Sequence, residues 1–220
     1  MGSLTDDPDF RATTFVVVDF ETTTPTGHPA QPIEVAALAL RCQDGAWTEA
    51  GRSTSLIRPP AFAPVTPADT AQTGLTAAEL AGAPDVAHVM GALDRRFTPD
   101  SQYLLVAQHA ATEANVIHNA RAHCPTLARV NFLDTIPLAK HLFPGLANYK
   151  LDTLLAHFTI PRPAARHRAY ADVDVTAKVF LHLLDAADDT SQLTDLAALV
   201  KVAGRTARSN VPVQGGLFDI

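Results

Sequence analysis

The stretch FVVVDFETTT, residues 15–24, ends an apolar run with two carboxylates, Asp19 and Glu21. Alternate side chains of a β-strand point to the same face, so both acids would project together from the end of a buried strand. Neighbouring carboxylates repel each other unless a cation lies between them, and hard oxygen ligands suit Mg²⁺ or Mn²⁺. The pair predicts a divalent-cation site, and solvated acids at a strand end are the alternative.

Two other segments supply further acids and a histidine. Glu113 follows a short apolar strand in LLVAQHAATEANV, and His167 precedes Asp172 by five residues in HRAYADVD, at the start of a long helix. Two divalent ions about 3.5–4 Å apart are the usual device for cleaving a phosphodiester. A nearby histidine can accept the proton of the attacking water. If these segments converge, their side chains predict hydrolysis of a nucleic acid.

The elements that must bring these residues together alternate along the chain. Strands come first, and strands alternating with helices follow, which predicts an α/β sheet with helices packed on its faces. Thr76 and Glu79 have the spacing of a capping box at a helix start. A proline-rich segment, 59–67, predicts an extended surface loop. The expected strands are 13–20, 33–42, 47–59, 103–108 and 131–135. One short helix is expected directly after Thr76, and the other expected helices are 84–97, 112–124, 136–143, 151–158, 169–187 and 191–202.

Composition restricts the class of protein. The 220 residues predict one domain, 1–203, followed by a flexible tail, 204–220. A net charge of −6 argues against non-specific coating of nucleic acid by charge. The sequence has no apolar run near the ~18 residues of a membrane span, so no membrane contact is expected. Its acidic N-terminus and its two cysteines, Cys42 and Cys124, predict a cytoplasmic protein without disulfides.

The three motifs occur in order between residues 13 and 186, and they resemble those of the DEDD exonucleases. The His-containing, DnaQ-like branch of this superfamily includes the proofreading subunit of bacterial replicative polymerases and ribonuclease T. The resemblance implies a ribonuclease-H-like fold with a mixed five-stranded sheet flanked by helices. It also implies two cations, Mg²⁺ or Mn²⁺, held by Asp19, Glu21 and Asp172, with Asp19 bridging. Glu113 would act on the more solvated cation, and His167 would be the general base.

The sequence departs from this family in two places. The second motif usually reads His-Asn and then Asp four residues after the Asn, whereas Gln108, His109 and Glu113 stand at these positions here. Glutamate keeps the charge but adds a methylene, so we expect an altered second metal site. Thr24 and Pro25 replace the usual glycine after the first motif, which predicts a differently shaped loop at the terminal nucleotide.

Several residues are candidates for substrate binding. Thr22 and Thr23 stand where the family contacts the terminal nucleotide. His109 would either hydrogen-bond a phosphate or simply end a strand. Arg166 and Arg168, with Arg162 nearby, form a local basic patch that would hold the phosphate backbone or remain a solvated loop.

The expected function is a metal-dependent 3′–5′ exonuclease that releases nucleoside monophosphates from single-stranded or frayed 3′ ends, DNA first. One alternative is an RNA 3′-end trimming enzyme like ribonuclease T, because nothing in the sequence identifies what faces the 2′ position. A non-catalytic nucleic-acid or protein-binding module on the same fold is the alternative from another class.

The C-terminal stretch SNVPVQGGLFDI resembles the short peptides that bind the bacterial sliding clamp. In such a peptide Leu217 and Phe218 would fill an apolar pocket while Gln214 hydrogen-bonds at its rim. Gly215 and Gly216 weaken the match, and they raise the entropy lost on ordering. A disordered tail, or a tail folded back on the domain, is the alternative.

Overall fold

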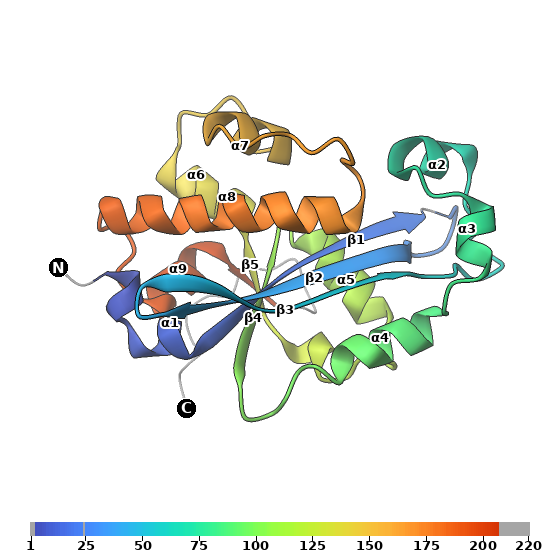
Figure 1. The fold of residues 1–220 in the computed structure, drawn as a ribbon, viewed down its shortest axis with the longest axis horizontal. Helices are drawn as coiled ribbons and strands as arrows, with labels where there is room; N and C mark the ends of the chain where they lie inside the picture. Colours follow the sequence, from blue (N-terminus) through green and yellow to red (C-terminus); the bar gives the residue numbers. More distant parts are fainter. Residues whose placement is uncertain (1–2, 24, 207–220) are drawn as a thin grey trace.

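A six-stranded mixed sheet forms the centre of the computed structural model, which describes residues 3–23 and 25–206. The strand order is β3-β2-β1-β4-β5-β6 (Figure 1). β1, β4 and β5 run parallel to one another. β2 is antiparallel to β1, β3 is antiparallel to β2, and β6 is antiparallel to β5. The strands are β1 (Thr13–Thr23), β2 (Gln31–Gln43), β3 (Ala46–Leu56), β4 (Gln102–Ala107), β5 (Phe132–Asp134) and β6 (Gly204–Arg205).

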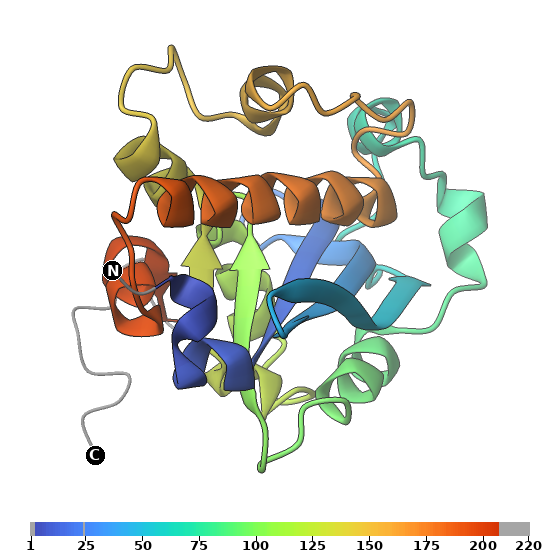
Figure 2. The ribbon, with the colours of Figure 1, turned by 60° about the vertical axis from the view of Figure 1, so that its left-hand side comes forward.

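Helices cover both faces of the sheet. α8 runs along one face, and α4 and α5 lie on the other (Figures 1 and 2). The helices are α1 (Pro8–Ala12), α2 (Pro67–Thr73), α3 (Ala77–Ala81), α4 (Val86–Asp94), α5 (Ala111–Asn119), α6 (Thr135–Leu142), α7 (Leu151–His157), α8 (Ala169–Asp189) and α9 (Leu196–Ala203), with 3₁₀ turns at Leu4–Asp6 and Leu127–Arg129.

The continuous apolar run of β1 is explained by burial on both faces. Phe15 and Val17 belong to the core cluster under α8, whereas Val16 and Val18 belong to the cluster on the α4 and α5 side. A strand with only one buried face would alternate apolar and polar residues. β1 therefore lies inside the sheet, and its C-terminal end carries the first two acids between two layers of helices.

The expectation of a mixed α/β sheet is confirmed, but the expected count of five strands is wrong. The sixth strand consists of Gly204 and Arg205, which pair with Leu133 and Phe132 of β5. The sequence pattern predicted that these two residues belong to the tail, 204–220, because a two-residue strand has no periodicity of its own.

Other expectations are tested by local contacts. The capping box at Thr76 is present, since Thr76 Oγ1 accepts from the Glu79 N–H and the Glu79 carboxylate accepts from the Thr76 N–H. Cys42 and Cys124 are both free, buried thiols, as expected. Among the described residues, no helix is both long and apolar enough to span a membrane. Gln214, Leu217 and Phe218 lie outside the described residues.

Candidate active site

The first two acids lie at the C-terminal end of β1 and point to the same side of the sheet. Phe20, between them, points to the opposite side and packs in the core cluster of α4 and α5. In the antiparallel pairing with β2, Asp19 is opposite Ala36 and Glu21 is opposite Glu34. A register irregularity follows Glu21, after which Thr22 and Thr23 pair with Pro32 and Gln31. The strand thus delivers two carboxylates to one edge, as its alternation predicts.

The third motif brings His167 and Asp172 to the same edge through the beginning of α8. His167 lies just before the helix with φ of 64°, and its N–H donates to Asp172 Oδ2 at 3.3 Å. Ligand atoms of Glu21, His167 and Asp172 all lie within 4.8 Å of one another. Glu21 and His167, which are 146 positions apart in the sequence, therefore meet in a group that is small enough to hold one metal ion.

Glu113 completes the acid cluster from α5. It is the third residue of this helix and is 4% exposed. Its Oε2 and the Oδ1 of Asp172 are buried and have no hydrogen-bond partner among the described residues. Leaving a buried carboxylate oxygen unpaired costs free energy, so binding of a cation to these two atoms would be favourable.

Burial and mutual repulsion raise the pKa values of three acids in this cluster. Burial raises the pKa of Asp19 well above its ordinary value, and the charges of Glu21 and Asp172 raise it further. Burial, followed by repulsion from Asp172 and Glu34, raises the pKa of Glu21 from 4.5 to about 7. Burial and then the charge of Asp19 raise the pKa of Glu113. Such shifts indicate that the cluster favours any added positive charge.

A divalent cation fits this donor set. The cluster offers carboxylate oxygens from β1, α5 and α8 together with an imidazole, and hard cations prefer oxygen ligands. A cation would pair the unpartnered oxygens of Glu113 and Asp172 and would offset the repulsion that raises the neighbouring pKa values. Glu21, His167 and Asp172 form the compact group that could hold it, and Asp19 and Glu113 lie close enough to this group to interact with its charges.

The unusual second motif adopts a tight turn between β4 and α5. Asp134 fixes this turn, because its carboxylate accepts from the backbone N–H of His109 at 3.3 Å and of Ala110 at 3.1 Å. His109 is exposed with φ of 67°, and its Nδ1 lies 3.1 Å from Thr112 Oγ1. Gln108 instead points to the interior and donates to the carbonyl of Tyr149 at 2.8 Å. The His109 side chain is therefore exposed at the turn, whereas the Gln108 side chain is held within the protein.

The two threonines after Glu21 have different surroundings. Thr23 is 1% exposed, and its hydroxyl lies 3.5 Å from the carbonyl oxygen of Ala63 in the loop after β3. Thr22 is half-buried and is the next-to-last residue of β1. The Thr23 hydroxyl is thus engaged within the protein, and Thr22 is the more accessible of the two.

The arginines of the basic segment are all paired with acids. Arg166 donates through Nε to Asp152 at 2.9 Å and through a terminal nitrogen to Asp172. Arg162 lies 3.3 Å from Asp152. Arg168 binds Glu34. The sequence did not indicate these partners, which make the basic segment a set of ion pairs beside the acid cluster.

Sequence reasoning missed Glu34 and Asp152. Glu34 is a lone acid within the apolar strand segment PIEVAALAL, and it is 2% exposed. An acid in a buried strand is almost always paired, so its position alone was a usable signal. Asp152 sits in the first turn of α7, where an acid is ordinary, and nothing in the sequence distinguished it.

Solved structures with a similar fold include two nucleases. The nuclease domain of 3′hExo, described as a DEDDh family member bound to rAMP, aligns with a TM-score of 0.68 and 14% identity over 83% of this chain and 96% of that chain. Exonuclease I of E. coli in complex with a dT13 oligonucleotide aligns with a TM-score of 0.64 and 18% identity over 82% of this chain and 42% of that chain. At these identities the similarity defines the fold, which is the expected ribonuclease-H-like one.

Sequence comparison then gives the family. Residues 16–180 match the model of the RNase T exonuclease family. The chain therefore belongs to this exonuclease family.

Three relatives are DNA polymerase III proteins. The subunit epsilon of Aquifex aeolicus is 30% identical over 174 residues, which cover 78% of this chain and 81% of the relative. The subunit epsilon-like protein of Rhodobacter capsulatus is 33% identical over 197 residues, covering 86% of this chain and 26% of the relative. The PolC-type polymerase of Caldanaerobacter subterraneus is 28% identical over 171 residues, which cover 78% of this chain and 12% of the relative. The chain thus spans only a small part of the latter two.

Proposed function

We propose that this domain is a Mg²⁺- or Mn²⁺-dependent 3′–5′ exonuclease that removes nucleoside monophosphates from single-stranded or frayed DNA 3′ ends. The observation that carries the proposal is the close group of Glu21, His167 and Asp172, beside which Asp19 and Glu113 interact with the same charges and two buried carboxylate oxygens have no hydrogen-bond partner among the described residues. An acid cluster that served only stability would pair these oxygens within the protein.

The roles proposed for the residues follow from their positions. Asp19, Glu21 and Asp172 would hold two cations, and Glu113 would act on the more solvated one. Bound cations would supply Lewis-acid stabilisation of the scissile phosphate and of the leaving oxygen. His167 would accept the proton of the attacking water, since its ring lies beside Glu21 and Asp172 at the mouth of the cluster.

Substrate contacts are proposed for the accessible residues near the cluster. Thr22 and the backbone around Thr23 would contact the terminal nucleotide, and exposed His109 would hydrogen-bond a phosphate oxygen. Arg166 would leave Asp172 when cations bind there and would then face the phosphate, while Asp152 keeps hold of its Nε. Arg166 thus joins the site as a cation that balances the acids before metal arrives.

DNA is proposed as the substrate because the relatives that cover most of this chain are named as DNA polymerase III proteins. RNA trimming is the second candidate, since the 3′hExo nuclease domain is described as bound to rAMP. A direct test uses matched DNA and RNA oligonucleotides of one sequence, labelled at the 3′ end, with Mn²⁺ or with chelator. Faster release of labelled mononucleotide from DNA supports the proposal, and faster release from RNA replaces it with RNA trimming.

A docking role is proposed for the tail through Gln214, Leu217 and Phe218. A bacterial sliding clamp would bind this peptide, which would bring an acidic enzyme to DNA that it cannot hold strongly by charge. Titration of the clamp with the whole chain and with a variant lacking residues 212–220 tests this. Binding by the whole chain alone supports docking, and equal or absent binding by both discards it.

A further inference from the structure

Glu34 is a buried acid next to the active site that none of the proposed catalytic roles uses. It lies in β2, is 2% exposed, and stands opposite Glu21 in the pairing of β1 with β2. Its charge is close enough to contribute to the raised pKa of Glu21. A fifth acid there adds to the repulsion in the cluster, so its presence needs a compensating function.

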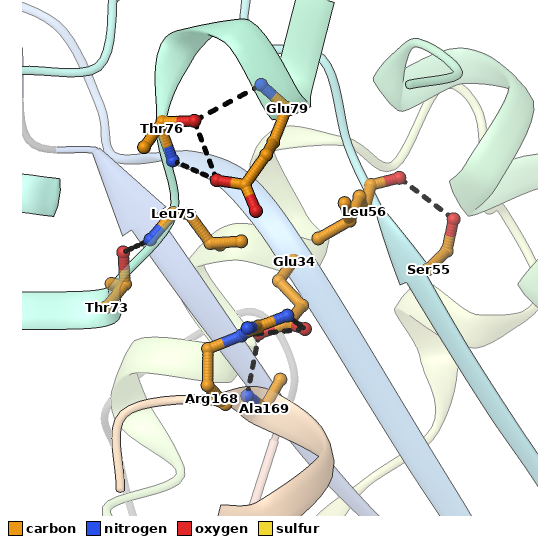
Figure 3. A network of polar contacts seen from close by, with 9 residues as sticks. All are labelled: Glu34, Ser55, Leu56, Thr73, Leu75, Thr76, Glu79, Arg168 and Ala169. Carbon is orange, nitrogen blue, oxygen red and sulfur yellow. Dashed lines mark hydrogen bonds and ion pairs between the residues drawn. The ribbon is translucent and has the colours of Figure 1, made fainter. Parts of the chain in front are cut away.

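The partner of Glu34 is the segment that begins α8. Arg168 Nε lies 3.1 Å from Glu34 Oε2, and an Arg168 terminal nitrogen lies 3.0 Å from Oε1, so the pair is bidentate. The N–H of Ala169, the first residue of α8, donates to Oε2 at 2.9 Å. Figure 3 shows the Glu34 side chain reaching from β2 to Arg168 and Ala169.

This contact replaces the ordinary cap of α8. The N-cap residue, Arg168, makes no capping hydrogen bond with its own side chain. The first N–H groups of a helix need acceptors, and a carboxylate there also interacts favourably with the helix dipole. Glu34 meets both needs from a different element, so it ties the beginning of α8 to the strand that is paired with β1.

The Glu34 contacts with Arg168 and Ala169 lie between His167 and Asp172 in the sequence, the two residues of this segment that are proposed to act in catalysis. His167 immediately precedes Arg168 and has φ of 64°, a backbone conformation that persists in a non-glycine residue only where its surroundings impose it. Asp172 lies one turn into the helix, and its Oδ2 accepts from the His167 N–H. Any shift of the Arg168–Ala169 segment therefore moves the imidazole and the carboxylate together.

We propose that the Glu34–Arg168 pair is a positioning device that holds His167 and Asp172 against Glu21, and that Arg168 does not contact the substrate phosphate. This inference rests on the exonuclease function proposed above. It gives Glu34 and Arg168 the role of outer partners that orient the residues holding a cation, and such partners typically change metal affinity or activity by about 10–100-fold when removed.

Metal binding separates positioning from simple electrostatics without relying on activity. Calorimetric titration of the whole chain with Mn²⁺ would compare Glu34→Gln, Arg168→Gln and the double variant. Positioning predicts that both single variants bind Mn²⁺ about 10–100-fold more weakly and that the double variant is no worse than either. An effect of charge alone predicts opposite signs: losing the Glu34 charge weakens Mn²⁺ binding, and losing the Arg168 charge tightens it. Tighter or unchanged binding by Arg168→Gln therefore overturns the proposal.

Kinetics separate positioning from phosphate contact. On a single-stranded DNA oligonucleotide, positioning predicts a lower kcat with little change in KM for both single variants, and partial rescue by Arg168→Lys. A phosphate contact predicts a higher KM for Arg168→Gln and no loss of kcat for Glu34→Gln, and this result would overturn the proposal. If the wild-type chain has no exonuclease activity, the proposed function fails, and the Mn²⁺ titration still decides the positioning role.

Two controls keep the result interpretable. Glu49→Gln breaks the bidentate but exposed Glu49–Arg52 pair on β3 and should leave both Mn²⁺ affinity and kcat unchanged. The double variant leaves no unpaired charge buried, so it remains folded if either single variant does not. Fluorescence of Trp47, the single tryptophan, reports folding of each variant. A folded double variant with wild-type Mn²⁺ affinity and kcat would also overturn the proposal.

Discussion

Glu21→Gln should stabilise the metal-free protein, and this gain should appear only at pH values at which Glu21 is charged. Burial and the neighbouring acids raise the pKa of Glu21 from 4.5 to about 7. The folded state therefore binds its proton more tightly than the unfolded state does. Between these two values a rise in pH removes the proton from the unfolded chain first, so the wild-type protein loses stability as pH rises through this window. Glutamine is uncharged on both sides of the window and loses nothing.

The magnitude follows from the shift. One pKa unit corresponds to about 1.4 kcal/mol, so the full effect is about 3 kcal/mol at pH 8.5 and about 1 kcal/mol or less at pH 5. For a domain of this size, 3 kcal/mol corresponds to an increase in Tm of about 6–12 °C. The variant should thus gain stability relative to wild type as pH rises, while losing the ability to bind a cation well.

Urea unfolding of chelator-treated protein measures the difference. Trp47 is a suitable probe because its ring packs edge-on against Phe10 and Phe15 in the core. The matched control is Asp44→Asn, an exposed carboxylate at the β2–β3 turn, which should change little at either pH. Added Mn²⁺ should stabilise wild type more than Glu21→Gln, because a ligand that binds the folded state adds stability that grows with the logarithm of its affinity.

The reasoning is refuted if Glu21→Gln is no more stable than wild type at pH 8.5, or if its advantage is the same at pH 5 and pH 8.5. Either result would mean that the burial of the charged Glu21 carboxylate and its repulsion by the neighbouring acids do not lower the stability of the metal-free protein.

Three further predictions concern activity. Asp19→Ala should abolish cleavage of single-stranded DNA with the fold kept, because it removes a proposed cation ligand and also relieves repulsion; circular dichroism and a cleavage assay check both parts. His167→Ala should lower the rate about 10²–10⁴-fold while Mn²⁺ binding remains, the usual size of general-base catalysis, and an unchanged rate would remove His167 from the mechanism. Glu113→Gln should nearly abolish activity and Glu113→Asp should alter the Mn²⁺-to-Mg²⁺ rate ratio, whereas a fully active Glu113→Gln would exclude Glu113 as a functional acid.

The sequence predicts those parts of the fold in which local pattern and tertiary burial agree. The apolar run of β1 and the long amphipathic α8 are buried as their patterns indicate, and the capping box at Thr76 forms. α1 was not predicted, because it is only five residues long and depends on contacts that are distant in sequence. The carboxylate of Asp7, its N-cap, accepts from the N–H of Leu196 at 2.6 Å.

The acids of the site could be found from sequence, but their partners could not. The spacing of Asp19 and Glu21 within an apolar strand predicts that both carboxylates lie on one face. The pairing of Arg168 with Glu34 spans 134 residues and depends on where α8 meets β2. An arginine near an acid cluster is compatible with phosphate binding and with an ion pair, and only the three-dimensional arrangement separates them.

The central claim is metal-dependent hydrolysis from the 3′ end, and one time course tests it most directly. A single-stranded DNA oligonucleotide labelled at its 5′ end is incubated with the wild-type chain in Mn²⁺, in chelator, and with the Asp19→Ala variant. We predict a ladder of products that shorten one nucleotide at a time and keep the label, formed only by wild type with Mn²⁺. Early release of the label as a mononucleotide, a single internal cut, or equal cleavage in chelator would contradict the account.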